Sequence, residues 1–279
     1  MHNLKPSNKD AFTIYKDAVN RKREGDEKTL LTSNEALVEH CYKDYDNRFT
    51  AGDVNVIIPH TINAELKKTL FDMYEYSNKA VRDIRADIIK NNPPNVVGFC
   101  QNCGLTHANT MDHYLPHEKF PEYSIHAQNL IPCCSECNEK KGDAEILNMY
   151  LDILPDKEYL FMDVERSGDT LSFTFRLENK SGEVDAALFN RIEFHYNKLN
   201  LFSRMKDAAI QALPRFELDI KPYYKASGKD VIIATNRETI EDMRKAYGYN
   251  YWEVAFRKGV IESDEFWAYY KERIDSDLI

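Results

Sequence analysis

Apolar residues recur at helical spacing over much of the N-terminal third of the chain. This pattern predicts helices over residues 11–23, 33–45 and 62–89, and Thr61 is placed to cap the third of them. The sequence Asn91-Asn-Pro-Pro-Asn95 then ends the helical pattern, because a proline disfavours helical backbone in the residue before it. We therefore expect residues 1–95 to form a helical N-terminal region.

The C-terminal half combines a strand pair with further helices. Apolar and polar residues alternate over 170–177, which predicts a strand with one buried face that pairs with residues 160–164 around Ser167-Gly-Asp169. Helical spacing recurs over 144–150, 185–213 (ended by Pro214), 236–247, 250–258 and 263–273. We expect a mostly helical α+β fold, with a small module over 96–150 and a hairpin-plus-helix region over 151–279.

Composition and charge narrow the class of protein. The chain has 37 Lys and Arg against 46 Asp and Glu, a formal net charge of −9, and 43% hydrophobic residues. Such an acidic chain does not fit a non-specific nucleic-acid binder, which needs a concentrated positive surface. No apolar run is long enough to span a bilayer, and the first residues lack the apolar core of a secretory signal. We expect a cytoplasmic protein with no membrane partner.

The cysteines are unevenly placed, and two CxxC pairs stand out. Cys100 and Cys103 form the first pair, and Cys134 and Cys137 form the second. Each CxxC turn presents two thiolates to one side of a metal, so two turns supply the four ligands of a structural zinc site. Cys133 abuts the second pair, but the two-residue spacing selects Cys134. Ordinary buried cysteines are the alternative interpretation, and a redox pair needs only one CxxC.

The segment between the pairs carries residues suited to hydrolysis. Asp112 and His113 are adjacent, Asn129 precedes a short apolar stretch, and Asn138 directly follows the last cysteine of the second pair. A carboxylate can hold a divalent ion while a neighbouring imidazole takes a proton from water. The zinc would fix where the Asn138 amide points.

This arrangement resembles the HNH endonuclease family, whose metal-binding motif runs strand, loop, strand, helix. The resemblance covers residues 100–143 and rests on the paired CxxC turns, on DH with a proline three residues after the histidine, on an NL-type second strand, and on CN-x-K-x-G at the helix. It implies that His113 is the general base that activates water against a phosphodiester. It implies that Asp112 and Asn138 hold one catalytic Mg²⁺ or Mn²⁺, and that Asn129 orients the His113 ring.

Other residues of the module have weaker assignments. Asn138 stands where some family members have a histidine, which favours hard, oxygen-preferring ions such as Mg²⁺. Lys140 and Lys141 are candidates for contact with phosphate. The remaining histidines have no position in the motif, and we expect loop or surface positions for His107, His117 and His126.

The charge of the module raises the question of how it would hold DNA. Residues 100–143 contain three Lys and Arg against six Asp and Glu, so positive charge must come from the flanks or from another protein. Helices before the module, and a long helix after it, more loosely resemble the HNH effector subunits of bacterial anti-phage systems of the Septu type. That resemblance implies a regulated nuclease that works with a partner protein, an ATPase.

The leading hypothesis is therefore a metal-dependent HNH endonuclease that hydrolyses DNA and contains one structural zinc. A ribonuclease with the same site is an alternative, because water attack on a phosphodiester does not require deoxyribose. A non-catalytic zinc module that binds nucleic acid or protein is a third. It is disfavoured because every position that the chemistry needs is filled.

Overall fold

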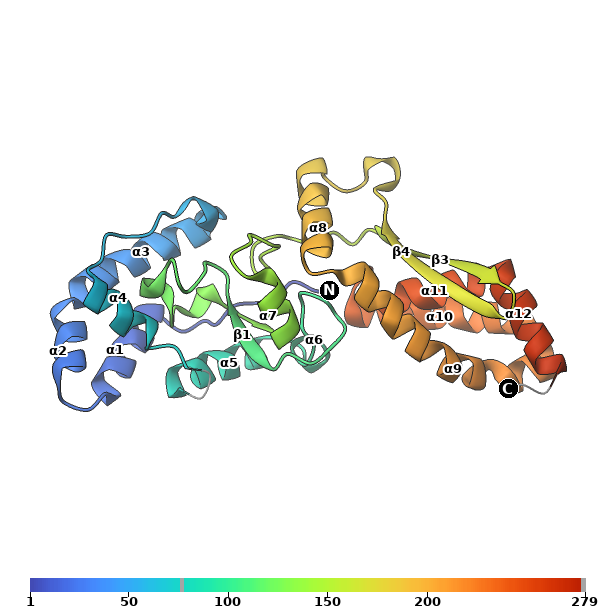
Figure 1. Cartoon of the computed structure of the whole chain (residues 1–279), viewed down its shortest axis with the longest axis horizontal. Coiled ribbons are helices and arrows are strands. Elements are labelled where there is room, and N and C mark those ends of the chain that lie inside the picture. The colour runs from blue at the N-terminus through green and yellow to red at the C-terminus, as the bar shows by residue number, and fades with distance from the viewer. Residues whose placement is uncertain (76–77, 277–279) are drawn as a thin grey trace. The chain divides into compact units, whose positions relative to one another are not determined.

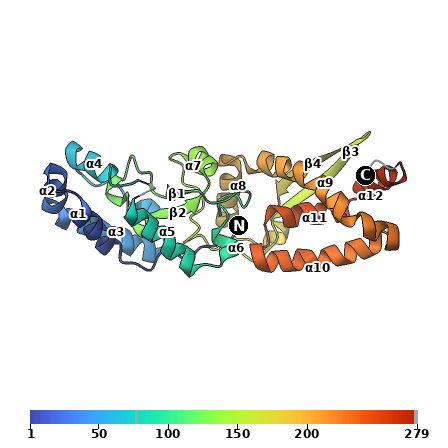
Figure 2. The ribbon, with the colours of Figure 1, turned by 90° about the horizontal axis from the view of Figure 1, so that it is seen from below.

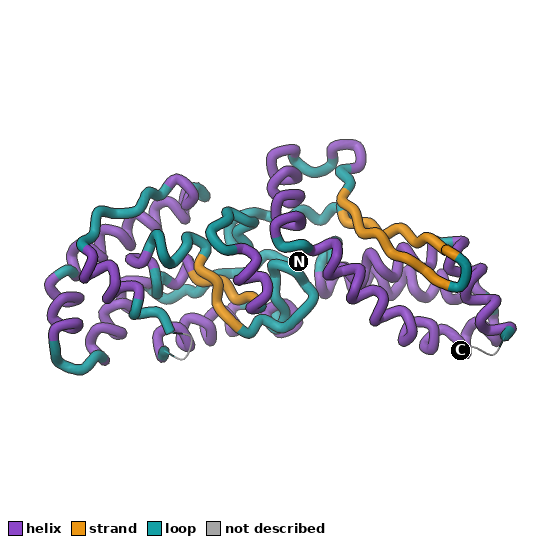
Figure 3. Tube along the Cα trace, in the orientation of Figure 1, coloured by secondary structure: helices purple, strands orange, loops and turns teal. Residues whose placement is uncertain are grey.

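The computed structural model describes residues 1–75 and 78–276. It shows the expected mostly helical α+β fold, with two separate antiparallel strand pairs among the described residues (Figure 3). The chain divides into two compact units. The N-terminal unit comprises Asn3–Asn102 and residues 106–153, and the C-terminal unit comprises the chain from Leu154 onwards together with Met1–His2 and Cys103–Leu105.

The N-terminal unit surrounds one strand pair with helices (Figures 1 and 2). Its α-helices are α1 (Ala11–Arg21), α2 (Asp26–Ser33), α3 (Glu35–Ala51), α4 (Ala64–Phe71), α5 (Lys79–Asn91), α6 (Pro94–Val97) and α7 (Ser135–Lys141). Its strands are β1 (Thr110–His113) and β2 (Leu130–Cys133), and its short 3-10 helices are η1 (Val54–Val56), η2 (Pro121–Tyr123) and η3 (Ala127–Asn129).

The predicted helices over 11–23 and 33–45 are present as α1 and α3. The Asp10 side chain caps α1 by accepting the Thr13 N–H, which satisfies one of the donors left open at a helix start. The helix predicted over 62–89 is wrong as a single element, because α4 ends at Phe71 and α5 begins at Lys79. Part of that prediction, residues 76–77, lies outside the described residues.

Asparagine side chains explain where these two helices begin. Asn63 accepts the Leu66 N–H and caps α4, so the predicted cap at Thr61 is wrong by two residues. Asn78 accepts the Ala80 N–H and caps α5, while its amide donates to the Met73 carbonyl. Such local side-chain bonds favour a helix start over continuation of the preceding helix.

A strand–strand–helix segment lies inside this unit. β1 pairs antiparallel with β2, with Asp112 opposite Ile131 and His113 opposite Leu130. The helix α7 follows β2 closely and ends at Lys141, and the next residue, Gly142, has a φ of 52° that favours glycine. The helix expected over 144–150 is absent. Asn148 makes a turn there instead, by accepting the Tyr150 N–H.

The C-terminal unit packs helices against the second strand pair. β3 (Leu160–Ser167) and β4 (Thr170–Leu177) form the expected hairpin, with Phe173 and Phe175 on its buried face. The other elements are η4 (Lys180–Gly182), α8 (Ala186–Lys198), α9 (Leu201–Ser227), α10 (Lys229–Tyr247), α11 (Trp252–Glu262) and α12 (Asp264–Asp275). None of the described helices is both long and apolar enough to cross a membrane.

The long helix expected over 185–213 differs in two ways. It breaks at Asn200, whose left-handed backbone (φ 51°) separates α8 from α9. Moreover, Pro214 does not end it, because α9 runs through Pro214 and Pro222 to Ser227. Buried residues on both sides of Pro214, including Ala209 and Phe216, hold the helix against the unit. Tertiary packing therefore overrides the proline signal here.

Candidate active site and metal centre

The four cysteines of the CxxC pairs form one buried cluster. Their sulfur atoms all lie within 4.8 Å of one another, which confirms that Cys100, Cys103, Cys134 and Cys137 come together. The Cys137 N–H donates to the Cys134 sulfur at 3.4 Å, at the first turn of α7. Four buried thiol sulfurs are the donor set of a structural zinc site, so the cluster can hold one zinc ion.

The chain folds tightly around these cysteines. Gly104 has a left-handed backbone (φ 67°), and the next N–H, from Leu105, donates to the Cys103 sulfur at 3.4 Å. Backbone N–H groups that point at sulfur stabilise negative charge on a thiolate. The neighbouring Cys133 is buried in β2 but does not belong to the cluster, as the spacing predicted.

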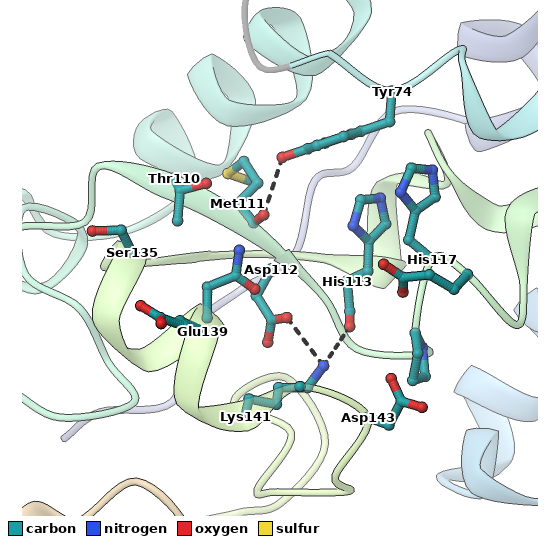
Figure 4. Close-up of a pocket in the computed structure, with 14 residues that line it drawn as sticks. Tyr74, Thr110, Met111, Asp112, His113, His117, Ser135, Glu139, Lys141 and Asp143 are labelled. Carbon is teal, nitrogen blue, oxygen red and sulfur yellow. Dashed lines mark hydrogen bonds and ion pairs between the residues drawn. The ribbon is translucent and has the colours of Figure 1, made fainter.

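A hollow of about 580 Å³ opens beside β1 and the start and end of α7 (Figure 4). The strand and the helix bring four predicted site residues to its wall, namely Asp112, His113, Asn138 and Lys141. Other polar residues of the wall are Tyr74, Thr110, His117, Glu118, Ser135, Glu139 and Asp143. Asn129 and Lys140 do not line it.

The His113 ring is held in a defined tautomer. Its Nε2 lies 2.9 Å from the Ser124 carbonyl oxygen. A carbonyl can only accept a hydrogen bond, so Nε2 carries the hydrogen and Nδ1 keeps a lone pair for a proton. Burial is the main cause that lowers the pKa of His113, to about 3, so the ring is neutral at physiological pH. A neutral imidazole with one open nitrogen can act as a base.

Aromatic rings fix the plane of the same imidazole. His117 stacks on His113 with ring centroids 4.4 Å apart, and Tyr74 meets it edge-on at 4.3 Å. His117 is itself held by Phe71. The two rings stack with centroids 3.9 Å apart, and the His117 Nε2 donates to the Phe71 carbonyl. These contacts come from the loop after β1 and from the end of α4, outside the motif.

The three histidines without a motif position lie at loop or surface positions, as expected, but two of them are not at the surface. His117 is half-buried at the wall of the hollow, and His126 is fully buried among tyrosines, because the loop between β1 and β2 folds inward. Of the three, His107 is exposed as expected. Sequence spacing gave no signal for the contact between His117 and His113, since it depends on how the loop packs on α4.

Asp112 is buried and paired with a lysine. The residue is 3% exposed, and its Oδ1 lies 3.0 Å from the Lys141 ammonium. Burial raises the pKa of Asp112 to about 6, and the nearby Lys141 charge opposes this rise. Lys141 is itself only 1% exposed and also donates to the His113 carbonyl at 2.6 Å. It is thus no surface lysine, and its hydrogen bonds to β1 differ from the expected contact with phosphate.

Asn129 holds the loop rather than the histidine ring. Its Oδ1 accepts the Leu115 N–H at 2.7 Å, and its amide donates to the carbonyls of Leu115 and Tyr123. None of its hydrogen bonds among the described residues reaches His113. An orienting effect of Asn129 on the ring would therefore pass through the loop that carries Ser124.

Asp112 and Asn138 offer oxygen atoms to the hollow. Both residues line the wall; the Lys141 ammonium binds Oδ1 of Asp112, and the His113 backbone N–H also donates to this carboxylate. Carboxylate and amide oxygens are ligands that Mg²⁺ and Mn²⁺ prefer. The donor set therefore fits the implied divalent ion.

The rim of the hollow carries more negative than positive charge. Glu118, Glu139 and Asp143 line it, and the only ion pair described among these three joins Asp143 to Lys119 at 2.9 Å. Lys140 pairs weakly with Glu136, at 3.9 Å, on the exposed side of α7. The local charge thus remains unfavourable for an incoming polyanion.

Comparison with known proteins gives limited information. No family model and no solved structure matches the chain. Over 94 residues the chain is 27% identical to Protein ea31 of Escherichia phage lambda. The match covers 34% of this chain and 31% of that protein, so it spans about a third of either sequence.

Proposed function

We propose that the chain is a metal-dependent HNH endonuclease that hydrolyses phosphodiester bonds in DNA. The observation that carries the proposal is the hollow where Asp112 and His113 at the end of β1 meet Asn138 of α7, beside a buried four-cysteine cluster. The strand–strand–helix order of these elements is the one that the resemblance to the family implies. The donor types and the histidine tautomer are those that the reaction requires.

In the proposed reaction, His113 removes a proton from water. The Ser124 carbonyl holds the Nε2 hydrogen, so that the lone pair of Nδ1 receives the proton as the water oxygen bonds to phosphorus. The bond from phosphorus to the 3′ oxygen breaks in the same step, and the 3′ oxygen leaves and takes up a proton from solvent. His117 and Tyr74 restrict the ring to one plane, which limits the directions from which water is activated. Asp112 and Asn138 would hold Mg²⁺ or Mn²⁺, which supplies positive charge to the phosphate when bound.

Zinc in the cysteine cluster would have a structural role. A tetrathiolate site leaves no open position for water or substrate. Because Cys134 and Cys137 belong to the start of α7, the ion would fix the helix that carries Asn138. The negative rim supports the further proposal that a partner protein, an ATPase in a Septu-type anti-phage system, supplies the positive surface that DNA needs.

The direct test is cleavage by the full-length chain. Supercoiled plasmid and a single-stranded RNA are each incubated with zinc-loaded protein in Mg²⁺, in Mn²⁺ and in EDTA. We expect ion-dependent nicking of the plasmid. Cleavage of the RNA alone would assign the same site to a ribonuclease. If neither substrate is cut, and the protein also fails to bind Mn²⁺, the endonuclease proposal is wrong.

A further inference from the structure

Lys141 makes contacts that its position in the sequence gives no reason to expect. The residue is 1% exposed, and its ammonium lies 3.0 Å from Oδ1 of Asp112 and 2.6 Å from the carbonyl oxygen of His113. Burying a charge is costly unless it is paired and hydrogen-bonded, and both conditions are met here. The ammonium therefore joins α7 to the two adjacent residues of β1 that the proposed chemistry uses.

These contacts restrict the orientation of the Asp112 carboxylate. The terminal torsion of an aspartate is broad, so an unpaired carboxylate samples many orientations. Here Oδ1 is held by Lys141, as a dashed line in Figure 4 marks, whereas no hydrogen bond to the ammonium is described for the second oxygen. Since Asp112 lines the hollow, that second oxygen is the one available to a ligand.

The same lysine relates Asp112 to Asn138. Lys141 follows Asn138 by three positions on α7, which places the two side chains on neighbouring parts of the helix surface. Lys141 also follows Cys137 by four positions, so its inward direction is set by the turn that the cysteine cluster anchors. A bond from Lys141 to Asp112 thus fixes the carboxylate relative to the Asn138 amide.

We propose that Lys141 is a positioning residue that holds the Asp112 carboxylate, against Asn138, in the orientation that a divalent cation requires. This inference rests on the proposed function, because it takes Asp112 and Asn138 as the ligands. Lys141 acts through Asp112 and does not contact the substrate. Groups that orient metal ligands change metal affinity by about 10–100-fold when they are removed.

The test measures Mn²⁺ binding without any substrate. Mn²⁺ is titrated into the zinc-loaded, full-length chain by calorimetry, with electron paramagnetic resonance as a second readout of free Mn²⁺. Lys141→Met keeps most of the apolar stem but removes the ammonium, and we expect Mn²⁺ affinity to fall about 10–100-fold. Asp112→Asn identifies the binding event that belongs to this site, because it removes the charged ligand.

Lys140→Met is the matched control. Lys140 is the neighbouring residue on α7, carries the same charge and is described in an ion pair with the exposed Glu136, at 3.9 Å. We expect its Mn²⁺ affinity to stay within about 2-fold of wild type, as is usual for a surface change of this kind. Lys141→Arg keeps the positive charge but changes the length and shape of the side chain. It tests the positioning role if the Met variant loses zinc or folded structure. It should bind Mn²⁺ more weakly than wild type.

Each outcome decides between explanations. Unchanged affinity in a folded Lys141→Met variant would overturn the positioning role and leave the proposed function intact. Tighter binding would overturn it as well, because Lys141 would then act as a cation that repels the metal. If wild-type protein binds no Mn²⁺ that Asp112→Asn abolishes, the proposed metal site and this inference both fail.

Discussion

Two buried histidines show how surroundings decide what a residue can do. His113 lines the hollow and donates through Nε2 to a carbonyl, which leaves Nδ1 as the nitrogen with a lone pair. His126 is 0% exposed, accepts the Gln128 N–H through Nδ1 and directs Nε2 at Asp46, 3.3 Å away. The first ring faces a cavity that can admit water, whereas the second lies among tyrosines and serves the fold.

The burial of His126 makes stability depend on pH. Burial lowers the pKa of His126, although Asp46 opposes this effect. The unfolded chain binds a proton near pH 6.5, while the folded chain excludes it until lower pH. The contribution of His126 is therefore complete above about pH 6.5 and is lost as the pH falls below that value.

The comparison of wild type with His126→Asn isolates this effect. Asparagine keeps an acceptor for the Gln128 N–H but does not titrate. We expect the stability advantage of wild type, measured by urea unfolding with far-UV circular dichroism, to shrink by about 1 kcal/mol between pH 7.5 and 5.5. An advantage that stays constant over this range would show that His126 titrates alike in both states.

Sequence patterns predicted the residues with fixed spacing and missed those that depend on packing. The CxxC turns impose a local geometry, so the spacing predicted which four cysteines form the cluster and that Cys133 is not among them. Lys141 gave no such signal, because its burial depends on where β1 lies relative to α7. Tyr74 was missed for the same reason, since its contact with His113 joins two segments far apart in the chain.

At the scale of single elements, α9 shows the limit of local rules. A proline inside a helix removes one hydrogen bond and crowds the carbonyl four residues earlier. This was the reason to end the helix at Pro214, yet α9 continues because its buried residues pack against the unit on either side. The opposite error was made over residues 144–150, where the pattern predicted a helix that is absent. There the Asn148 side chain accepts the Tyr150 N–H and forms a turn.

Pro214 should therefore destabilise α9 relative to the same helix with alanine at this position. Pro214 is exposed, so Pro214→Ala removes few contacts and restores the N–H that the Ile210 carbonyl lacks. We expect the free energy of unfolding to rise by about 1–3 kcal/mol. Both tryptophans, Trp252 and Trp267, lie in the C-terminal unit, so their fluorescence in urea reports on this unit.

Pro155→Ala is the control for this comparison. Pro155 lies in the loop before β3, outside any helix, so its replacement relieves no helical strain. We expect a small decrease in stability, because the unfolded chain gains conformational freedom. If Pro214→Ala leaves the tryptophan transition unchanged or lowers it, the proline does not strain α9.

At the scale of the whole molecule, the chain has two units with separate cores. All residues of the candidate active site lie in the N-terminal unit. The cysteine cluster lies next to β1 and β2, which have only four residues each and so contribute few backbone hydrogen bonds. Zinc binding would therefore supply folding energy that this segment does not gain from a large core.

Replacement of one cluster cysteine tests that dependence. We expect wild type to contain about one zinc ion per chain, and Cys134→Ala to lack it and to become poorly soluble. The adjacent Cys133→Ala is the matched control, because it is equally buried but outside the cluster, and it should retain zinc. Metal content is measured by elemental analysis of the purified proteins. A zinc-free Cys134→Ala protein with wild-type stability would refute the structural role.

The central claim is that His113 activates water in a metal-dependent nuclease. The most direct measurement compares plasmid nicking in Mn²⁺ by wild type, His113→Ala and His107→Ala, each with its zinc content verified. We expect His107→Ala to cut like wild type, because that ring is exposed and does not line the hollow. His113→Ala should cut about 10²–10⁴-fold more slowly. Equal cutting by His113→Ala and wild type would contradict the account.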